Sequence, residues 1–238
     1  KQTQFAESYT DTRKSLGAFL ENVKEFASNV KYEAQYQWKQ IKQPVYDKVK
    51  DVKLGVPISI NIDNGVAAMA MAQLNGVNDE EVKRGMESFR GVDRRFDFKV
   101  KTDKMVFLSD YAHHPNEINQ SVKSVRELYS DKKIAAIFQP HLYTRTRDFY
   151  KEFAAALSLL DTVYLCDIYP AREQPIPGVT SKIIYDNLRD GMEKYLIHKE
   201  DILDIARKGN FDVLISLGAG DIENYVPEIT KKLTERAK

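Results

Sequence analysis

The chain has 238 residues, 42% of them hydrophobic, and a formal net charge of +1 at pH 7. This length is sufficient for one sizeable core, or for an α/β domain with a smaller piece, and the balanced charge excludes a strong long-range attraction to nucleic acids or membranes. The only cysteine, Cys166, excludes an internal disulfide and is predicted to be an inert core thiol in a reducing compartment. Because no apolar run is long enough to span a bilayer and residues 1–20 lack a signal-peptide core, we expect a cytoplasmic protein.

Residues 1–51 are predicted to form a helical extension. Apolar side chains recur there with a helical period, and charged residues lie on the opposite face. This face is expected to pack on a neighbouring part of the protein; the alternative is a helix that docks on a partner or on a membrane surface. The apolar positions are Leu16, Phe19, Leu20, Val23, Phe26, Ala27 and Val30.

Residues 52–91 are predicted to contain two helices and no strand. An alanine-rich run is typical of a helix packed closely against another element, and it ends at Asn75-Gly76. Asn78 or Asp79 then caps a second helix over 80–89. Two helices without a sheet indicate the edge of a domain.

Strand-like and helix-like segments alternate from Phe96 to the end of the chain, which is typical of βαβ units. Val163–Cys166 and Val213–Ile215 have the continuous apolar character of strands buried on both faces. We therefore predict an α/β fold with a mostly parallel, Rossmann-like sheet flanked by helices. The predicted strands lie near 96–100, 105–109, 133–138, 162–166, 195–198 and 211–217, and the predicted helices near 116–129, 146–160, 181–193, 200–208 and 222–235.

Polar or small residues follow several of the predicted strands. They are Asp110, Gln139, Asp167 and Gly218–Asp221. Since open α/β sheets bind ligands outside the carboxyl ends of their strands, we expect the functional site at this edge of the sheet. Gly218-Ala219-Gly220 is too short for a dinucleotide fingerprint, and the chain has no Gly-x-x-x-x-Gly-Lys-Ser/Thr phosphate loop.

Three of the four histidines lie in two runs that close predicted strands: His113 and His114 after the first, and His141 after the second. Adjacent side chains on a regular element cannot face the same way. We therefore expect one of His113 and His114 to face a pocket and the other to be structural. Pro115 fits the first position of the following helix. No cysteine or histidine has the spacing of a zinc ligand set, so no metal site is predicted.

Asp110 and Arg145 are candidates for direct ligand contacts. A carboxylate at a strand end can accept hydrogen bonds from both hydroxyls of a ribose, and capping of the next turn is an equally good interpretation. Arg145 offers a fork of donors to a carboxylate or phosphate, and the alternative is a solvated surface arginine. The pair Arg94-Arg95 either places positive charge over phosphates or is solvated.

Six motifs together resemble the C-terminal domain of the Mur ligases and the end of their central domain. The three longest point, within the family, to the ligases that add L-alanine. The others resemble the junction between the two domains, a helix start late in the central domain and the last-strand loop. The resemblance covers about residues 52–238 and leaves 1–51 unmatched. The three longest motifs are Asp110–Pro115, Phe138–Thr146 and Asp167–Glu173. The domain junction is Gly91–Phe96, the helix start is Asn61–Ala68 and the last-strand loop is Gly218–Ile222.

The resemblance implies ATP-dependent amide formation in peptidoglycan precursor synthesis. The carboxylate of UDP-N-acetylmuramate is phosphorylated by ATP with Mg²⁺, and the amine of L-alanine then attacks the acyl phosphate. Carried onto this chain, the resemblance implies that Tyr111, His113 and Arg145 surround L-alanine, with Arg145 pairing its carboxylate. No residue is expected to act as a catalytic acid, base or nucleophile.

The resemblance also implies that this chain supplies one wall of an ATP site. Asp110 is expected to hold the ribose, Asn61 and Asn64 to lie near the adenine, and Arg95 to act at the hinge and the nucleotide. The ligands of Mg²⁺ are expected outside this chain, in the central domain of the complete enzyme.

The predicted organisation has three parts: a helical extension over 1–51, a helical remnant of the ATP-binding central domain over 52–91, and an amino-acid-binding α/β domain over 92–238. Since a chain without a phosphate loop or metal carboxylates is not expected to phosphorylate a substrate, we expect it to be inactive alone. One alternative is a stand-alone module that binds a small ligand or a protein partner through its N-terminal helix. Another is a structural protein whose pocket has no function.

Overall fold

The structure is a computed structural model that describes Val52 and residues 59–238, so the helical extension predicted over 1–51 lies outside the described residues. Contacts divide the chain into a mostly helical unit that includes residues 61–89 and an α/β unit that includes residues 90–238. In the described part of the chain, no helix is long and apolar enough to cross a membrane.

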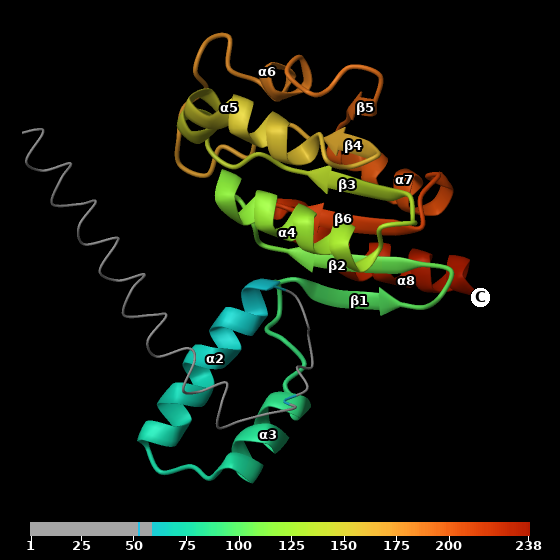
Figure 1. The fold of residues 1–238 in the computed structure, drawn as a ribbon. Coiled ribbons are helices and arrows are strands. Elements are labelled where there is room, and N and C mark those ends of the chain that lie inside the picture. The colour runs from blue at the N-terminus through green and yellow to red at the C-terminus, as the bar shows by residue number, and fades with distance from the viewer. Residues whose placement is uncertain (1–51, 53–58) are drawn as a thin grey trace, which may run out of the picture. The chain divides into compact units, whose positions relative to one another are not determined.

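The α/β unit is built on a six-stranded sheet with the order β1-β2-β6-β3-β4-β5 (Figure 1). β1 pairs antiparallel with β2, and every other neighbouring pair is parallel. The predicted mostly parallel sheet is therefore confirmed. The strands are β1 (Asp97–Lys101), β2 (Val106–Asp110), β3 (Ile134–Phe138), β4 (Thr162–Leu165), β5 (Glu193–Leu196) and β6 (Val213–Leu217).

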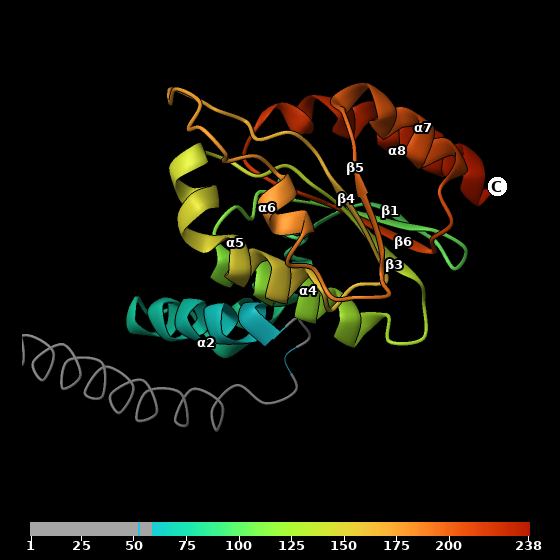
Figure 2. The same ribbon diagram turned by 90° about the horizontal axis from the view of Figure 1, so that it is seen from above.

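Helices cover both faces of this sheet, with α4, α5 and α6 on one face and α7 and α8 on the other (Figure 2). β2 continues into α4 and its neighbour β6 continues towards α8, so the chain leaves these two strands towards opposite faces. Such a topological switch point opens a crevice at the carboxyl ends of the strands. The helices are α4 (Pro115–Leu128), α5 (Tyr143–Leu157), α6 (Lys182–Tyr185), α7 (Ile202–Lys208) and α8 (Val226–Ala237), with 3-10 helices η1 (Lys199–Asp201) and η2 (Asp221–Tyr225).

The strand register aligns the carboxyl ends of the central strands. Asp110 of β2 and Phe138 of β3 both pair with Leu217 of β6, and Phe138 also pairs with Leu165 of β4. The last residues of four strands therefore form one row across the sheet. The loops that follow these strands start side by side, which brings distant parts of the sequence to one edge.

The core contains the one cysteine of the sequence, Cys166, directly after β4. The thiol is fully buried, and burial, together with the nearby carboxylates of Asp167 and Asp221, raises its pKa to about 12. A thiol that does not ionise near neutral pH is a poor nucleophile and metal ligand. The predicted core position of the thiol is confirmed, and its raised pKa supports the predicted inertness.

The helical unit contains the two helices that the sequence predicts. The first ends at Leu74, before Gly76 at a φ of +81°, a left-handed conformation that suits glycine at a helix end. The second begins with a capping box, in which the side chain of Asn78 accepts a hydrogen bond from the backbone N–H of Glu81, so Asn78 rather than Asp79 is the cap. The bounds are α2 (Ser59–Leu74) and α3 (Asp79–Ser88).

The helix predicted over 181–193 is wrong in its extent. α6 covers only Lys182–Tyr185, and β5 already begins at Glu193. Gly191, at a φ of +75°, turns the chain into this strand. The Lys194 ammonium donates to the backbone carbonyls of Tyr185 and Leu188, both at 3.2 Å, and thereby satisfies groups that a longer helix would have bonded internally.

Candidate functional site

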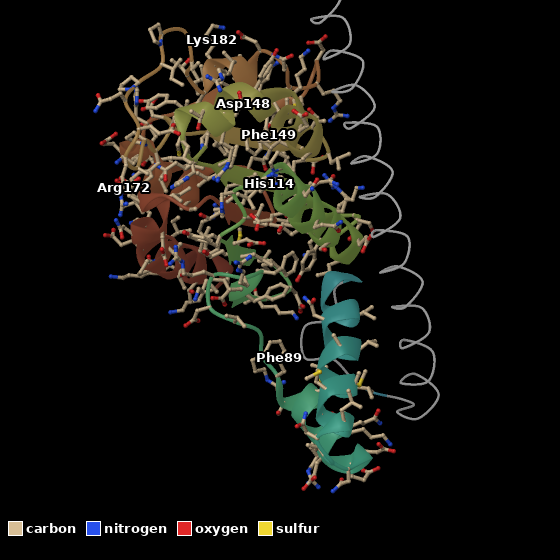
Figure 3. All side chains as sticks on the ribbon, turned by 90° about the vertical axis from the view of Figure 1, so that its left-hand side faces the viewer. Phe89, His114, Asp148, Phe149, Arg172 and Lys182 are labelled. Atoms are coloured by element: carbon tan, nitrogen blue, oxygen red, sulfur yellow. The ribbon has the colours of Figure 1, made fainter. Side chains whose placement is uncertain are left out.

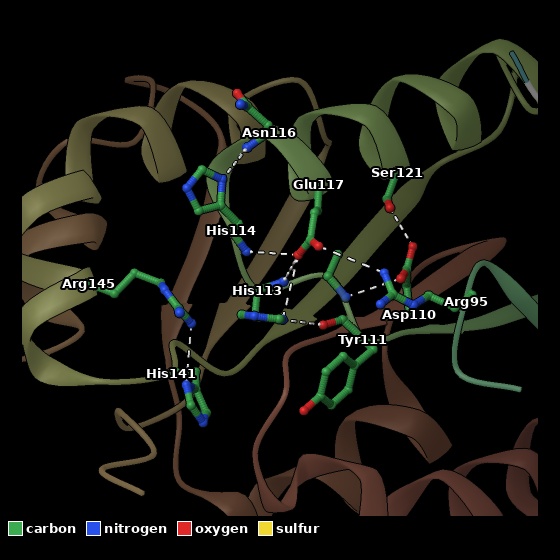
Figure 4. A network of polar contacts seen from close by, with 11 residues as sticks. Arg95, Asp110, Tyr111, His113, His114, Asn116, Glu117, Ser121, His141 and Arg145 are labelled. Atoms are coloured by element: carbon green, nitrogen blue, oxygen red, sulfur yellow. Dashed lines mark hydrogen bonds and ion pairs between the residues drawn. The ribbon is translucent and has the colours of Figure 1, made fainter. Parts of the chain in front are cut away.

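Asp110 ends β2 at the switch point, and its carboxylate is held by local hydrogen bonds (Figure 4). The side chain is 8% exposed; the backbone N–H of Ala112 donates to its Oδ1 at 3.1 Å, and the Ser121 hydroxyl donates to its Oδ2. The turn-capping interpretation is thus confirmed. Since a carboxylate offers about four acceptor positions, this does not exclude a contact with a ribose.

Burial raises the pKa of the Asp110 carboxyl, while hydrogen bonds from Ser121 and Ala112 and the charge of Arg95 act in the opposite direction. A folded-state pKa above the unfolded value of 3.8 means that the charged form is disfavoured by folding. The stabilisation from this group is present below pH 3.8 and is lost as the pH rises through the folded-state pKa. At neutral pH, Asp110 is therefore a buried charge that costs stability.

Asp110→Asn is expected to leave the α/β unit as stable as the original chain or to stabilise it by roughly 0.5–2 kcal/mol at pH 7. The amide oxygen still accepts from Ala112, and the Ser121 hydroxyl can turn to accept from the amide nitrogen. Urea unfolding at pH 7 and at pH 4 checks this, because the advantage of the variant shrinks as the pH falls towards 3.8. A destabilised variant at pH 7 would contradict the account of Asp110 as a costly buried charge.

His113 and His114 have different roles, as the sequence predicts. His114 is the N-cap of α4, where its Nδ1 accepts from the backbone N–H of Asn116 at 3.4 Å, and Pro115 takes the first helical position. Its ring lies 5.3 Å from that of Phe149 in α5 (Figure 3). His113 instead contacts Tyr111, with 5.2 Å between ring centroids. His114 is therefore structural, and His113 lies with the candidate ligand-binding residues.

Glu117 holds the turn that carries both histidines, a role that was not predicted from the sequence. Its carboxylate accepts from the backbone N–H groups of His113 and His114, each at 3.1 Å, and lies 3.8 Å from the Arg95 guanidinium. Burial raises the pKa of the Glu117 carboxyl, but the two backbone hydrogen bonds lower it by more. The net shift of its pKa is therefore downward. The sequence signal was the glutamate three residues after the cap, because capping boxes have this spacing.

Arg94 and Arg95 fold back onto Tyr111 (Figure 4 labels Arg95). The Arg94 guanidinium lies 4.3 Å from the centre of the Tyr111 ring and pairs with Glu223, and the backbone N–H of Tyr111 donates to the Arg94 carbonyl at 2.7 Å. The Arg94 guanidinium is thus engaged by Glu223 and the Tyr111 ring, although its side chain is still 42% exposed. Arg95 has the longer distance to the ring, 5.9 Å, and is the more exposed of the two towards solvent.

Arg145 lies in the first turn of α5, and its Nη1 lies 3.4 Å from the Nδ1 of His141 (Figure 4). Within the part of the chain that the structure describes, no carboxylate lies within ion-pair distance of its guanidinium. The nearby Glu173 accepts instead from the backbone N–H of Thr144 at 3.0 Å and from the Thr144 hydroxyl. The Arg145 guanidinium therefore keeps donors for a ligand.

Gln139 links the loop after β3 to the loop after β6. It is 2% exposed; its side chain donates to Asp221 at 2.7 Å and accepts from the backbone N–H of Ile222 at 3.0 Å. Asp221 also pairs with Lys199. The predicted convergence of Gln139 and Gly218–Asp221 is confirmed, whereas the side chain of Asp167 is exposed and pairs with His198.

The predicted site residues divide between the two units. Tyr111, His113, Arg145, Arg95 and Asp110 all belong to the α/β unit. Asn61 and Asn64 lie on α2 of the helical unit; Asn64 is exposed, and the side chain of Asn61 lies outside the described part. Their proximity to a nucleotide therefore stays a prediction. Among the described residues, no group of three or more acidic, histidine or cysteine side chains is arranged to hold a metal ion.

Known proteins with similar sequences support a family assignment. The family model described as "Mur ligase, glutamate ligase domain" matches residues 94–220. Over 188 residues the chain is 69% identical to the UDP-N-acetylmuramate–L-alanine ligase of Phocaeicola vulgatus, an alignment that covers 79% of this chain and 41% of that protein. The chain therefore spans less than half the length of the curated relatives that it matches.

Two further relatives extend the comparison. The ligase of the same name from Flavobacterium psychrophilum is 41% identical over 210 residues, 88% of this chain and 46% of that protein. This alignment is longer than residues 52–238, so it also includes part of the segment 1–51. The crystal structure of the UDP-N-acetylmuramate–alanine ligase MurC from Thermotoga maritima matches with a TM-score of 0.62 and 29% identity, covering 78% of this chain and 39% of that one.

Proposed function

The chain belongs to the Mur ligase family, and from this premise we propose that it is part of a cytoplasmic, ATP-dependent ligase that joins L-alanine to UDP-N-acetylmuramate. In this proposal the α/β unit supplies the L-alanine pocket and one wall of the ATP site. The relatives named for this activity, at 69% identity in one case, support the choice of substrate within the family. The remaining wall, the phosphate-binding groups and the Mg²⁺ ligands come from parts of the complete enzyme outside the described residues.

The observation that carries the proposal is the cluster around Arg145. Its guanidinium contacts His141 and keeps other donors free. The His141 ring contacts the ring of His113, which in turn contacts the ring of Tyr111. A planar fork of donors suits a carboxylate. Because the Nδ1 of His113 lies 2.9 Å from the Tyr111 carbonyl and donates to it, the Nε2 is the nitrogen that remains for the ligand amine.

ATP is proposed to lie against Asp110 and Arg95. The Asp110 carboxylate uses two of its acceptor positions within the fold and has positions left for ribose hydroxyls. Arg95, which precedes β1, offers positive charge 3.8 Å from the Glu117 carboxylate at the start of α4. Asn61 and Asn64 are proposed to face the adenine. Mg²⁺ supplies charge neutralisation at the phosphates, and no residue of the described chain is assigned to it.

The contribution of this chain to the reaction is positioning. Holding the L-alanine carboxylate on Arg145 fixes the direction of the amine, and holding the ribose on Asp110 fixes the nucleotide at the same edge of the sheet. Bringing two reactants into a fixed geometry lowers the barrier by avoiding the entropy loss of a bimolecular encounter. None of the side chains at this edge needs to act as a nucleophile or general acid for such a role.

A segment exchange tests the proposal. Residues 52–238 replace the matching segment of the Phocaeicola vulgatus ligase, and mass spectrometry follows product formation from ATP, Mg²⁺, UDP-N-acetylmuramate and L-alanine. We expect the hybrid to form the L-alanine product, and the chain alone to form none.

The amino acid that the hybrid ligates decides between an L-alanine ligase and a module without ligase activity. A folded hybrid that ligates L-alanine excludes a module without ligase activity. A folded hybrid that is inactive, or that ligates other amino acids in preference to L-alanine, would overturn the proposed function. The unmodified Phocaeicola vulgatus ligase, assayed in parallel, is the positive control for the assay.

A further inference from the structure

His141 contacts Arg145 and His113 of the proposed amino-acid site, and the residues before and after it are both hydrogen-bonded to Tyr169. It forms an isolated parallel bridge with Tyr169, whose N–H donates to the Pro140 carbonyl at 2.8 Å and whose carbonyl accepts from the N–H of Leu142 at 2.9 Å. Leu142 adopts a φ of +73°, which a side chain other than glycine rarely tolerates. A strained conformation persists only where the surroundings enforce it, so the direction of His141 is set by the fold.

The imidazole of His141 contacts two aromatic rings. It stacks on the Tyr169 ring with 5.6 Å between centroids and 27° between planes, and it meets the His113 ring edge-on at 5.9 Å. These contacts hold the plane of the ring. They leave the Nδ1 directed at the Nη1 of Arg145, 3.4 Å away, which is at the long end for hydrogen bonds.

The direction of this hydrogen bond follows from the chemistry of the donor. A guanidinium is protonated at any physiological pH and can only donate. The Nδ1 of His141 must therefore accept, and the imidazole must carry its proton on Nε2. A lowered pKa of His141 is consistent with a neutral ring. Burial lowers this pKa most, and the charges of Arg145 and His113 lower it further, while the carboxylate of Glu173 raises it by less.

We propose that His141 is a positioning residue, whose neutral imidazole accepts a hydrogen bond from Arg145 and so fixes the direction in which the guanidinium faces an amino-acid carboxylate. Among the described residues, no carboxylate takes this position, since Glu173 is occupied by Thr144. A neutral acceptor orients Arg145 without neutralising its charge, which an acidic partner would do. The part of the proposal that concerns the ligand rests on the proposed function; the hydrogen bond itself does not.

The hydrogen bond is tested first, on the whole chain without ligand. With ¹⁵N-labelled histidine, NMR is expected to show His141 with an unprotonated, hydrogen-bonded Nδ1. Arg145→Gln is expected to shift this Nδ1 resonance and to raise the pKa of His141, because a positive charge is removed. A proton on the Nδ1 of the neutral ring, or a resonance and pKa that Arg145→Gln leaves unchanged, would overturn the inference whatever the chain binds.

The effect on binding is tested by titrating L-alanine into the same chain. His141→Ala is expected to weaken binding about tenfold, the loss typical of one hydrogen bond to a charged group. His141→Asn places an amide oxygen near the position of the Nδ1 and is expected to restore most of this loss. His198→Asn, at an exposed histidine paired with Asp167, is the matched control and is expected to bind as the original chain does.

The two tests separate the positioning role from the proposed function. If L-alanine binds and neither His141 substitution changes its affinity, the positioning role is wrong and the proposed function stands. If L-alanine does not bind while the NMR result is as expected, the proposed ligand is wrong and the hydrogen bond that orients Arg145 stands.

Discussion

Arg145→Ala is expected to raise the L-alanine concentration that an active ligase containing this chain requires by roughly 30-fold to 300-fold, and to change its ATP requirement by less than about threefold. The reason is that Arg145 offers a carboxylate two charge-assisted hydrogen bonds, each stronger than a neutral one. It has no carboxylate partner among the described residues, so its removal leaves no buried charge unpaired. Steady-state kinetics of the segment-exchange hybrid, with each substrate varied in turn, measures the two requirements.

Two further substitutions show whether the effect belongs to the guanidinium fork. Arg145→Lys keeps the charge but loses the planar donor pair, so its effect is expected to lie between those of the original residue and alanine. Arg147→Ala is the matched control, since Arg147 lies two residues further along α5, is exposed and pairs with Asp148 at 2.7 Å. Equal increases in the L-alanine and ATP requirements for Arg145→Ala would contradict the assignment of Arg145 to the amino acid.

Gly220→Ala is expected to destabilise the α/β unit by about 2–4 kcal/mol, because the loop after β6 has no room for a side chain. A Cβ at this position would lie 2.3 Å from the Oε1 of Gln139 and 2.7 Å from the Cβ of Tyr169. Gln139 cannot withdraw without breaking its hydrogen bonds to Asp221 and Ile222. Tyr169 cannot withdraw without moving the backbone that holds His141. Urea unfolding followed by circular dichroism measures the loss.

Gly178→Ala is the matched control for this prediction. Gly178 has a φ of +78°, and a Cβ there would meet no atom within 4 Å. Its substitution carries only the cost of a left-handed conformation, about 1 kcal/mol. If both variants lose the same stability, the close approach of Gly220 to Gln139 and Tyr169 does not determine the need for glycine in this loop.

The sequence predicted the sheet well because buried parallel strands have a strong local signature. β6 is fully buried along its length and was predicted from the continuous apolar run Val213–Ile215. β5 was placed near 195–198 and is found at Glu193–Leu196, because an exposed edge strand lacks such a run. The helix predicted over 181–193 failed for a related reason: turn residues and the hydrogen bonds of Lys194 ended it after a single turn.

Within the site, the residues that the sequence identified and those that it missed differ in how far their contacts reach along the chain. Asp110 and Arg145 were predicted to contact ligands because of their residue type and their place after a strand, and these roles stay predictions. Glu173 was missed because its partner, Thr144, lies 29 residues away in the sequence. His141 was noticed in its motif, but its role depends on Tyr169 and His113, which only the fold places around its ring.

The sequence by itself determined the α/β class, the strand ends that carry polar residues, the inert character of Cys166 and the family resemblance, because each depends on local residue type or spacing. Only the tertiary structure decided that β6 lies between β2 and β3, which brings Asp110, Leu217 and Phe138 into one row. It also decided that Gln139 bonds to Asp221 and that Arg145 faces His141. These features depend on strand order and register, which are fixed when apolar faces pack together, and no local pattern in the sequence encodes them.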